Sequence, residues 1–363
     1  MNTALLAVSA PGIGDLTFAT DEWISYAQEV LTEQHAQFAE QLTDLAPFTL
    51  CEVGMNPPAY LKGADRLAWW ARFSATGVEV GNRELPEADC DYKIVADHSV
   101  LSNITRILYQ GTDPTLVAQA QSRLQKLSRW QIHGQASVHP VLKVIFANLH
   151  DALAHRTMPR HPFMTSEWVA SARYFLTQRA HSAKYAPGLR KVTFTFSEEF
   201  THTPHYAFPD GSHGGFWVHC DHGAITVGAG PLPAALEPAD MLTKGAYTPV
   251  VPVGRTVNAA MTEADLAAQK DYQRMAFSPD ANDGESPVTQ TQPSGRGPMP
   301  DVLARVFAPL HDALSKRTSG ELPGDFADVR QNWRTPQSFD RDPSYDGSWL
   351  RYDKVDIYGN PRG

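Results

Sequence analysis

The sequence has few cysteines, no cluster of positive charge and no long apolar run. Its 363 residues include three cysteines, Cys51, Cys90 and Cys220, too few and too scattered for a disulfide framework. The net charge of −9, without a basic cluster, argues against a nucleic-acid partner or an anionic membrane surface. No segment approaches the ~20 apolar residues that span a bilayer, and no basic residue precedes the short apolar stretch at 4–8. We therefore expect a cytoplasmic protein without integral membrane association.

The chain contains an internal repeat. Three matches define it: the Leu-His-Asp-Ala-Leu run at 149–153 and 310–314, Glu-Trp at 22–23 and 167–168, and the pair Trp70 and Trp217. The offset grows from 145 residues at Glu-Trp to 161 at the longer run, which indicates insertions in the second copy. We predict an N-terminal segment at 1–19, copies of one domain at 20–158 and 165–319, and an aromatic-rich tail at 320–363. The tail is expected to pack on the domains or to form an oligomer contact.

The pattern of apolar residues predicts an α+β fold. In copy one it predicts a helix from Trp23, strands at 48–53, 66–75, 77–84 and 91–96, helices at 98–109 and 114–127, a short strand at 130–133, and a closing helix. We expect each copy to be a mostly antiparallel five-stranded sheet with helices on one face. A polar stretch rich in Pro, Gly and Ser at 278–298 predicts a mobile surface loop in copy two.

Three stretches of copy one resemble the sterol carrier protein family. They are Cys90–Asp97, the Gly-Thr-Asp-Pro helix start at 111–114, and Leu127–Gly134. The resemblance covers most of copy one, whereas copy two lacks the Gly-x-x-Asp-Pro element and is linked only through the internal match. It implies a five-stranded sheet under helices with an apolar tunnel for lipids or similar ligands. The family has no shared catalytic residues to transfer.

Copy two carries a polar cluster between 198 and 223 that copy one lacks. Candidate catalytic residues are Glu199, His205, His219 and Asp221, and candidate metal ligands are His202, His205, His219 and Asp221. In a strand, His219 and Asp221 point to the same face. Two imidazoles and one carboxylate are typical ligands of Zn or non-haem Fe, and a histidine can also serve as a metal-free acid or base. The alternative is a polar loop followed by a hairpin turn.

Two further features have structural alternatives. Candidate pocket residues are Trp70, Trp217, Phe216 and Tyr206, although such aromatics are often core residues on a sheet face. The repeated His-Asp dipeptide, His150-Asp151 in copy one, is not expected to act as a pair, because adjacent helical residues point about 100° apart. We interpret it as a solvated helix edge on which Asp151 faces His155.

These observations support three hypotheses. The first is a protein that binds a small apolar or amphipathic molecule in an internal cavity. The second is an enzyme of the lyase, hydratase or hydrolase type that acts on such a molecule through the polar cluster of copy two. The third is a scaffold subunit with a partner-binding tail. The sequence leaves open whether the protein is an enzyme, whether Zn or Fe binds, and whether it forms a homo-oligomer.

Overall fold

The computed structural model describes residues 4–58, 61, 64–125, 131–134, 138–203, 207–208, 211–247, 250 and 288–319, with only the backbone at 311 and 312. The chain divides into two compact units, residues 1–160 (unit 1) and 161–363 (unit 2). The predicted copies at 20–158 and 165–319 fall one in each unit. The predicted tail at 320–363 lies outside the described residues. No helix in the described part of the chain is long and apolar enough to cross a membrane.

Unit 1 is built on a five-stranded sheet with the order β3-β2-β1-β4-β5. Its strands are β1 (Phe48–Met55), β2 (Arg66–Ser74), β3 (Gly77–Gly81), β4 (Tyr92–Asp97) and β5 (Gln131–His133). The central β1–β4 pair is parallel, and every other pair is antiparallel. The helices are α1 (Ala4–Val8), α2 (Asp21–Gln37), α3 (His98–Thr105), α4 (Pro114–Gln125) and α5 (Pro140–Ala154), with short 3₁₀ turns at Ala39–Gln41 and Glu87–Asp89.

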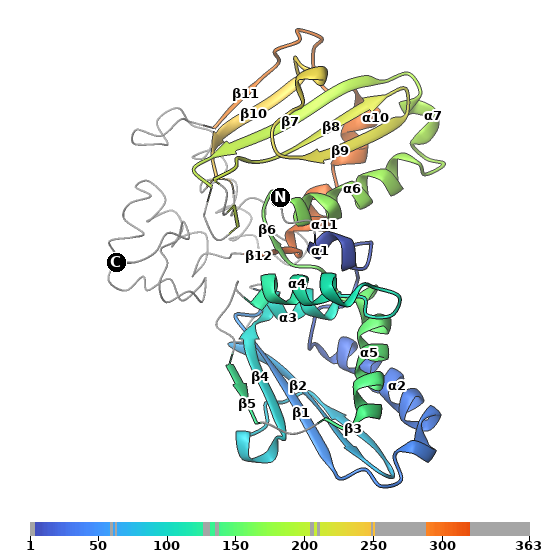
Figure 1. Cartoon of the computed structure of the whole chain (residues 1–363). Coiled ribbons are helices and arrows are strands. Elements are labelled where there is room, and N and C mark those ends of the chain that lie inside the picture. The colour runs from blue at the N-terminus through green and yellow to red at the C-terminus, as the bar shows by residue number, and fades with distance from the viewer. Residues whose placement is uncertain are drawn as a thin grey trace, which may run out of the picture. The chain divides into compact units, whose positions relative to one another are not determined.

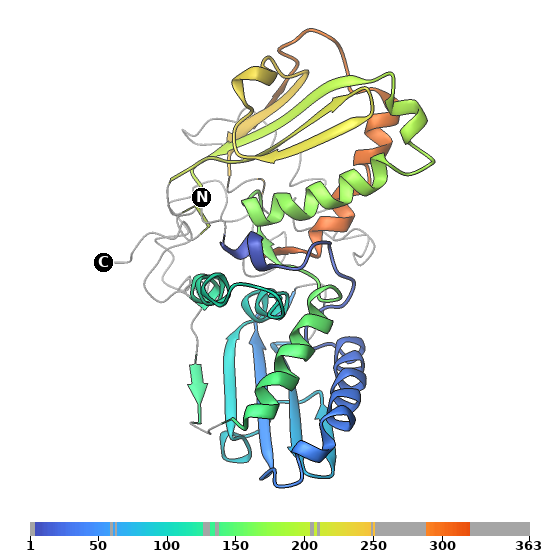
Figure 2. The ribbon, with the colours of Figure 1, turned by 45° about the vertical axis from the view of Figure 1, so that its right-hand side comes forward.

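Helices α2 and α5 cover one face of this sheet, and α3 and α4 lie at its end (Figure 1; Figure 2). Each forms where the sequence places apolar residues three or four apart, so that α5 buries Leu142, Ile145, Leu149 and Leu153. His139 caps α5 through its side chain, and Pro140 follows at the first helical position, where its missing N–H costs nothing. The apolar face predicted for this closing helix is therefore the face that meets the sheet.

Unit 2 repeats the arrangement with the strand order β11-β10-β7-β8-β9. Its sheet contains β7 (Thr193–Thr201), β8 (Gly214–Asp221), β9 (Ala224–Ala229), β10 (Met241–Ala246) and β11 (Thr289–Thr291). The helices are α6 (Ser166–Ala180), α7 (Ala186–Leu189), α10 (Asp301–Phe307) and α11 (Leu310–Ser315), with a 3₁₀ turn at Ala234–Leu236 and a small β6–β12 pair (His161–Pro162, Thr318–Ser319). Again the central pair, β7–β10, is the parallel one. The predicted fold class, two such sheets with helices on one face, is confirmed.

The same anchoring contacts recur in both units. The amide of Thr49 donates to Asp91 Oδ2 at 2.8 Å, and the amide of Thr195 donates to Asp240 Oδ2 at 2.7 Å. Each contact ties the start of a central strand to the residues before its parallel neighbour. Buried indoles repeat as well: those of Trp23 and Trp168 donate to threonine hydroxyls, Thr157 and Thr318, at 2.9 and 3.0 Å.

Trp70 and Trp217 also occupy like places. Trp70 lies opposite Gly81 in the β2–β3 ladder, and Trp217 lies opposite Gly228 in the β8–β9 ladder. A Cβ added at either glycine would come within 2.5 Å of the facing indole ring. Glycine is required at these positions because the ring lies flat across the neighbouring strand.

Two details of copy two differ from the prediction. Residues 289–291, within the stretch predicted as a mobile loop at 278–298, form the edge strand β11; residues 278–287 lie outside the described residues. Thr289 and Thr291 are β-branched, which favours a strand even where both faces are exposed. Copy two repeats the apolar face predicted for the closing helix of copy one, from Leu303 to Leu314, but this segment is divided into α10 and α11, because Pro309 has no amide hydrogen to continue α10.

Candidate functional site

Unit 1 contains a cavity of about 190 Å³ between the inner face of its sheet and helices α2, α3 and α5. Five aromatic residues line it: Trp23, Phe48, Trp69, Tyr92 and Phe146. Five aliphatic residues complete most of the wall: Leu50, Ile94, Val138, Leu149 and Leu153. The polar lining residues are Glu52, Thr105 and His150. The cavity is thus apolar with a small polar region.

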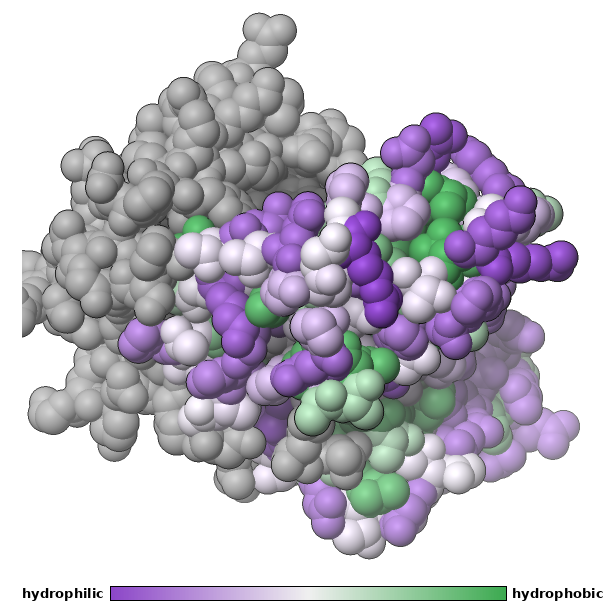
Figure 3. Space-filling view, turned by 90° about the horizontal axis from the view of Figure 1, so that it is seen from above, coloured by the Kyte–Doolittle hydropathy of each residue, from purple (hydrophilic) through white to green (hydrophobic). Residues whose placement is uncertain are grey.

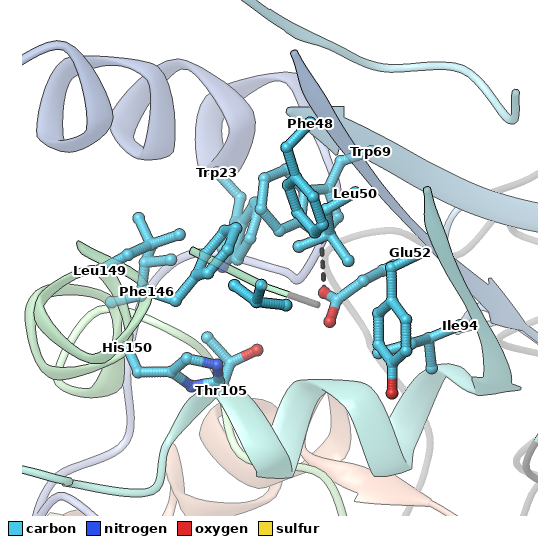
Figure 4. A pocket seen from close by; sticks show the side chains of 13 residues that line it. Trp23, Phe48, Leu50, Glu52, Trp69, Ile94, Thr105, Phe146, Leu149 and His150 are labelled. Atoms are coloured by element: carbon cyan, nitrogen blue, oxygen red, sulfur yellow. Dashed lines mark hydrogen bonds between the residues drawn. The ribbon is translucent and has the colours of Figure 1, made fainter. Parts of the chain in front are cut away.

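Strand alternation places Glu52 in this cavity. Phe48, Leu50 and Glu52 are two residues apart on β1 and share its inner face. Trp69 lies directly opposite Glu52 on β2. The Trp69 indole N–H donates to Glu52 Oε2 at 2.7 Å, and Figure 4 shows the carboxyl group pointing into the cavity beside the aromatic rings.

Glu52 has no counter-ion among the residues that the structure describes. Within the described part of the chain its one hydrogen bond is that from Trp69, and no Lys or Arg lines the cavity. Burial raises the pKa of the Glu52 carboxyl to about 7, against the smaller opposite effect of the Trp69 hydrogen bond. The group therefore changes charge near neutral pH, which is unusual for a glutamate and is often associated with functional sites.

His150 and Thr105 lie across the cavity from Glu52 (Figure 4). The His150 ring packs against Tyr109 with 4.9 Å between ring centroids, and its Nδ1 is buried without a hydrogen-bond partner among the described residues. Burial lowers the pKa of His150 to about 4, so the imidazole is neutral at pH 7. The Thr105 hydroxyl donates to the Leu101 carbonyl at 2.9 Å.

The interpretation of His150-Asp151 as a solvated helix edge is wrong for His150, which lines the cavity. Asp151 accepts the backbone amides of Tyr109 at 2.6 Å and Gln110 at 3.0 Å, while His155 is exposed. The physical reason is tertiary: the turn after α3 brings two unpaired amides to α5, and Asp151 satisfies them.

Unit 2 has a counterpart of Glu52. Glu198 lies opposite Phe216 on β8, as Glu52 lies opposite Trp69 on β2. Burial raises the pKa of Glu198 to about 7 as well, and no hydrogen bond to its carboxyl occurs among the described residues. A buried carboxyl at the same place on both sheets is therefore a property of the repeated domain.

The neighbouring position differs between the units. Leu50 lines the cavity of unit 1, whereas its counterpart in unit 2 is Phe196. The Phe196 ring lies 5.6 Å from Phe216 and 5.5 Å from Phe307, both in edge-to-face contact. By the internal match, Phe216 and Phe307 correspond to Trp69 and Phe146, which line the cavity in unit 1. In unit 2 the Phe196 ring therefore lies between Phe216 and Phe307, whose counterparts line the cavity in unit 1.

Three of the predicted catalytic residues, Glu199, His219 and Asp221, lie on the outer face of the unit 2 sheet and have separate partners. His219 Nδ1 contacts Thr195 Oγ1 at 2.9 Å, and Asp221 Oδ1 contacts His222 Nδ1 at 2.6 Å, a pairing that lowers the pKa of the Asp221 carboxyl. Asp221 and His222 are exposed at the β8–β9 hairpin. His219 and Asp221 share one face, as the alternation predicts.

Glu199 belongs to a third group. It accepts from His213 Nδ1 at 2.8 Å and from Lys244 Nζ at 3.0 Å. Burial acts to raise the pKa of the Glu199 carboxyl, but these two partners together lower it below its usual value. Glu199 is four residues along β7 from Thr195, the residue opposite His219, which separates the two positions by about 13 Å.

The described residues contain no group of three or more His, Cys, Asp or Glu side chains that could hold a metal ion. His202 is exposed and contacts Thr201 Oγ1 at 3.1 Å. His205 and Tyr206 lie outside the described residues, so the candidate site that includes them stays a prediction. Among the described residues visible in Figure 3, hydrophilic side chains predominate and apolar residues form smaller patches.

Of the candidate pocket aromatics, Phe216 is on the inner face and Trp70 and Trp217 are on the outer faces. Trp70 packs with Cys51, Val53 and Leu85 on the side of the sheet away from the cavity. The cavity residue is its neighbour Trp69. Sequence reasoning missed Glu52 and His150; the signal that could have found Glu52 was an acidic residue at an apolar-facing strand position, repeated at Glu198.

No family model, no curated protein and no solved structure matches this chain.

Proposed function

We propose that unit 1 binds a small, largely apolar molecule carrying one polar group, in the cavity between its sheet and helices α2, α3 and α5. The observation that carries the proposal is an apolar cavity with one uncompensated carboxyl, Glu52, in its wall. Small-molecule sites commonly combine apolar and aromatic walls with a few polar groups that orient the ligand. The resemblance to the sterol carrier family supports the same class of function.

The volume limits the size of the ligand. An engineered apolar cavity of about 150 Å³ binds benzene, and sites for drug-sized ligands measure about 300–1,000 Å³. At about 190 Å³, the cavity suits a molecule of roughly six to ten non-hydrogen atoms. The ligand we propose is therefore smaller than the lipids that the family resemblance implies.

The apolar walls of this open cavity favour an occupant. Water in the cavity lies against aromatic and aliphatic side chains, and a ligand that displaces it removes apolar surface from water. The repeated domain shows another way to cover such walls, because Phe196 stands where unit 1 has Leu50. A ligand that binds the folded unit also stabilises it.

Titration of the whole chain with benzyl alcohol and with toluene tests the proposal. We expect each compound to bind at one site. Binding can be detected by saturation-transfer NMR, or by tryptophan fluorescence because Trp23 and Trp69 line the cavity. Leu50→Phe, which copies the chain's own second unit, should remove binding. Val144→Phe on the exposed side of α5 is the matched control and should leave binding intact. Equal binding by the wild type and Leu50→Phe, or no binding at all, would contradict the proposal.

A further inference from the structure

The polar groups in the cavity mostly offer lone pairs. Glu52 Oε1 receives no hydrogen bond in the described part of the chain, and the Trp69 N–H is already used on Oε2. The Thr105 hydroxyl hydrogen is used on the Leu101 carbonyl. A ligand that fits the ionised carboxylate supplies N–H or O–H donors, and the Tyr92 hydroxyl can either donate or accept.

His150 adds no charge to the cavity wall. Burial lowers the pKa of His150 to about 4, so its ring is neutral at pH 7. Its Nδ1 is buried from solvent and has no hydrogen-bond partner among the described residues. Glu52 is therefore the group through which the wall can attract a charged ligand.

The aromatic walls favour positive charge. Five aromatic rings, from α2, β1, β2, β4 and α5, line the same cavity as the Glu52 carboxyl: those of Trp23, Phe48, Trp69, Tyr92 and Phe146. The face of an aromatic ring carries partial negative charge and attracts cations, tryptophan most strongly. Aromatic rings and a carboxylate in one cavity are the two kinds of group that bind organic ammonium ions.

We infer that the ligand of the unit 1 cavity is a small organic ammonium ion, a primary amine on a compact aromatic or branched alkyl group, bound with its N–H groups at Glu52. The inference rests on the proposed function and adds the charge of the ligand to it. The ammonium group supplies the counter-ion that the cavity wall lacks, and the apolar group fills the rest of the volume. The chain's net charge of −9 favours the approach of a cation.

The sign of the pH dependence separates an ammonium ligand from a neutral one. The titratable groups that line the cavity are Glu52 from β1, Tyr92 from β4 and His150 from α5. Asp151 lies beside His150, and Tyr109 packs on the His150 ring and interacts with the Glu52 charge, its pKa raised to about 12 by burial. Because the pKa of Glu52 is about 7 and that of His150 about 4, only Glu52 of these two changes charge between pH 6 and pH 8. An alkylamine stays protonated there, as lysine does, with a pKa near 10.

The ionised fraction of Glu52 rises from about one tenth at pH 6 to about nine tenths at pH 8, so the affinity for an ammonium ion rises about tenfold. An alcohol carries no charge, and its hydroxyl can donate to the carboxylate or accept from the protonated carboxyl, so its affinity should change much less over the same range. Binding of the ammonium ion at pH 7 also releases protons from Glu52.

The experiment compares benzylamine, benzyl alcohol and toluene on the whole chain by calorimetry at pH 6, 7 and 8, in buffers of different ionisation enthalpy. We expect benzylamine to bind at least tenfold more tightly than benzyl alcohol at pH 8, to gain about tenfold from pH 6 to pH 8, and to release protons. Glu52→Gln should lower benzylamine affinity at least tenfold, abolish its pH dependence, and leave toluene binding intact. Glu79→Gln, an exposed glutamate on β3, is the control and should change nothing.

The outcomes distinguish the two proposals. If benzyl alcohol and toluene bind and Leu50→Phe blocks them, but benzylamine binds no better at pH 8 than at pH 6, the cavity function stands and the ammonium inference is overturned. If benzylamine affinity rises with pH equally in Glu52→Gln, the inference is also overturned, because the charge then acts elsewhere. If none of the three compounds binds, both proposals fail.

Discussion

Replacement of Glu52 by glutamine should flatten the pH dependence of stability. The pKa of Glu52 rises from 4.5 to about 7 on folding, so the folded protein holds a proton that the unfolded chain has released. This contribution to stability is intact below pH 4.5 and is lost as the pH rises through 7. Glu52→Gln carries no such proton, and its amide oxygen can still accept from Trp69.

Linkage gives the magnitude. A shift of 2.5 pKa units corresponds to about 3.4 kcal/mol when fully expressed, and about 2.5 kcal/mol of this falls between pH 5 and pH 8. Because the side chain is only partly buried, we expect about 2 kcal/mol. The free energy of unfolding of Glu52→Gln, relative to that of the wild type, should therefore increase by about 2 kcal/mol from pH 5 to pH 8.

Urea denaturation of the whole chain at pH 5, 6.5 and 8, followed by circular dichroism and tryptophan fluorescence, measures this difference. Subtracting the variant from the wild type at each pH cancels the histidines, which titrate in both. Glu79→Gln on exposed β3 controls for the loss of one negative charge. If wild type and Glu52→Gln differ by the same free energy at all three pH values, the carboxyl is not the buried proton site described above.

Three further changes have outcomes set by single contacts. His98 is fully buried, and burial lowers the pKa of its imidazole to about 3, so the folded state loses stability as the pH falls from about 6.5 towards 3. His98→Gln should reduce this loss of stability at acid pH, measured by circular dichroism during an acid titration. Gly81→Ala places a Cβ 2.5 Å from an indole ring and should cost about 1–3 kcal/mol in thermal unfolding, whereas Gly77→Ala, with nothing within 4 Å, should cost less than 1 kcal/mol. Thr157→Val leaves the buried Trp23 N–H without its acceptor and should cost about 1–3 kcal/mol by urea denaturation, and an unchanged midpoint would refute the role given to that hydrogen bond.

The repeat and the strand alternation made most of the fold predictable. Apolar residues at every second position predicted the strands of unit 1 to within a few residues, and apolar residues three or four apart predicted α5. Local patterns gave no information on which strands are neighbours. The parallel β1–β4 pair joins segments about 40 residues apart, and nothing in either segment alone specifies it.

The site was harder to predict, for two physical reasons. The run Ala68-Trp69-Trp70-Ala71 reads the same in both directions, so alternation cannot say which tryptophan faces the helices. A cavity, moreover, is what remains after all side-chain volumes are placed, and one Leu or Phe on β1 or β7 decides whether a ring fills the space. The polar cluster of copy two was selected by residue type, whereas Glu199 and His219 prove to have separate partners.

The duplication suggested that copy two, with its added polar residues, is the specialised one, and the packing argues for the opposite. Filling a cavity stabilises a domain, so a copy released from ligand binding gains from a larger side chain at the Leu50 position. Phe196 is such a side chain, and its ring meets both Phe216 and Phe307. In unit 2 Glu198 keeps the carboxyl, but Phe196 stands where unit 1 has Leu50. Under the proposed function unit 1 is therefore the binding copy, because its carboxyl and its cavity lie together.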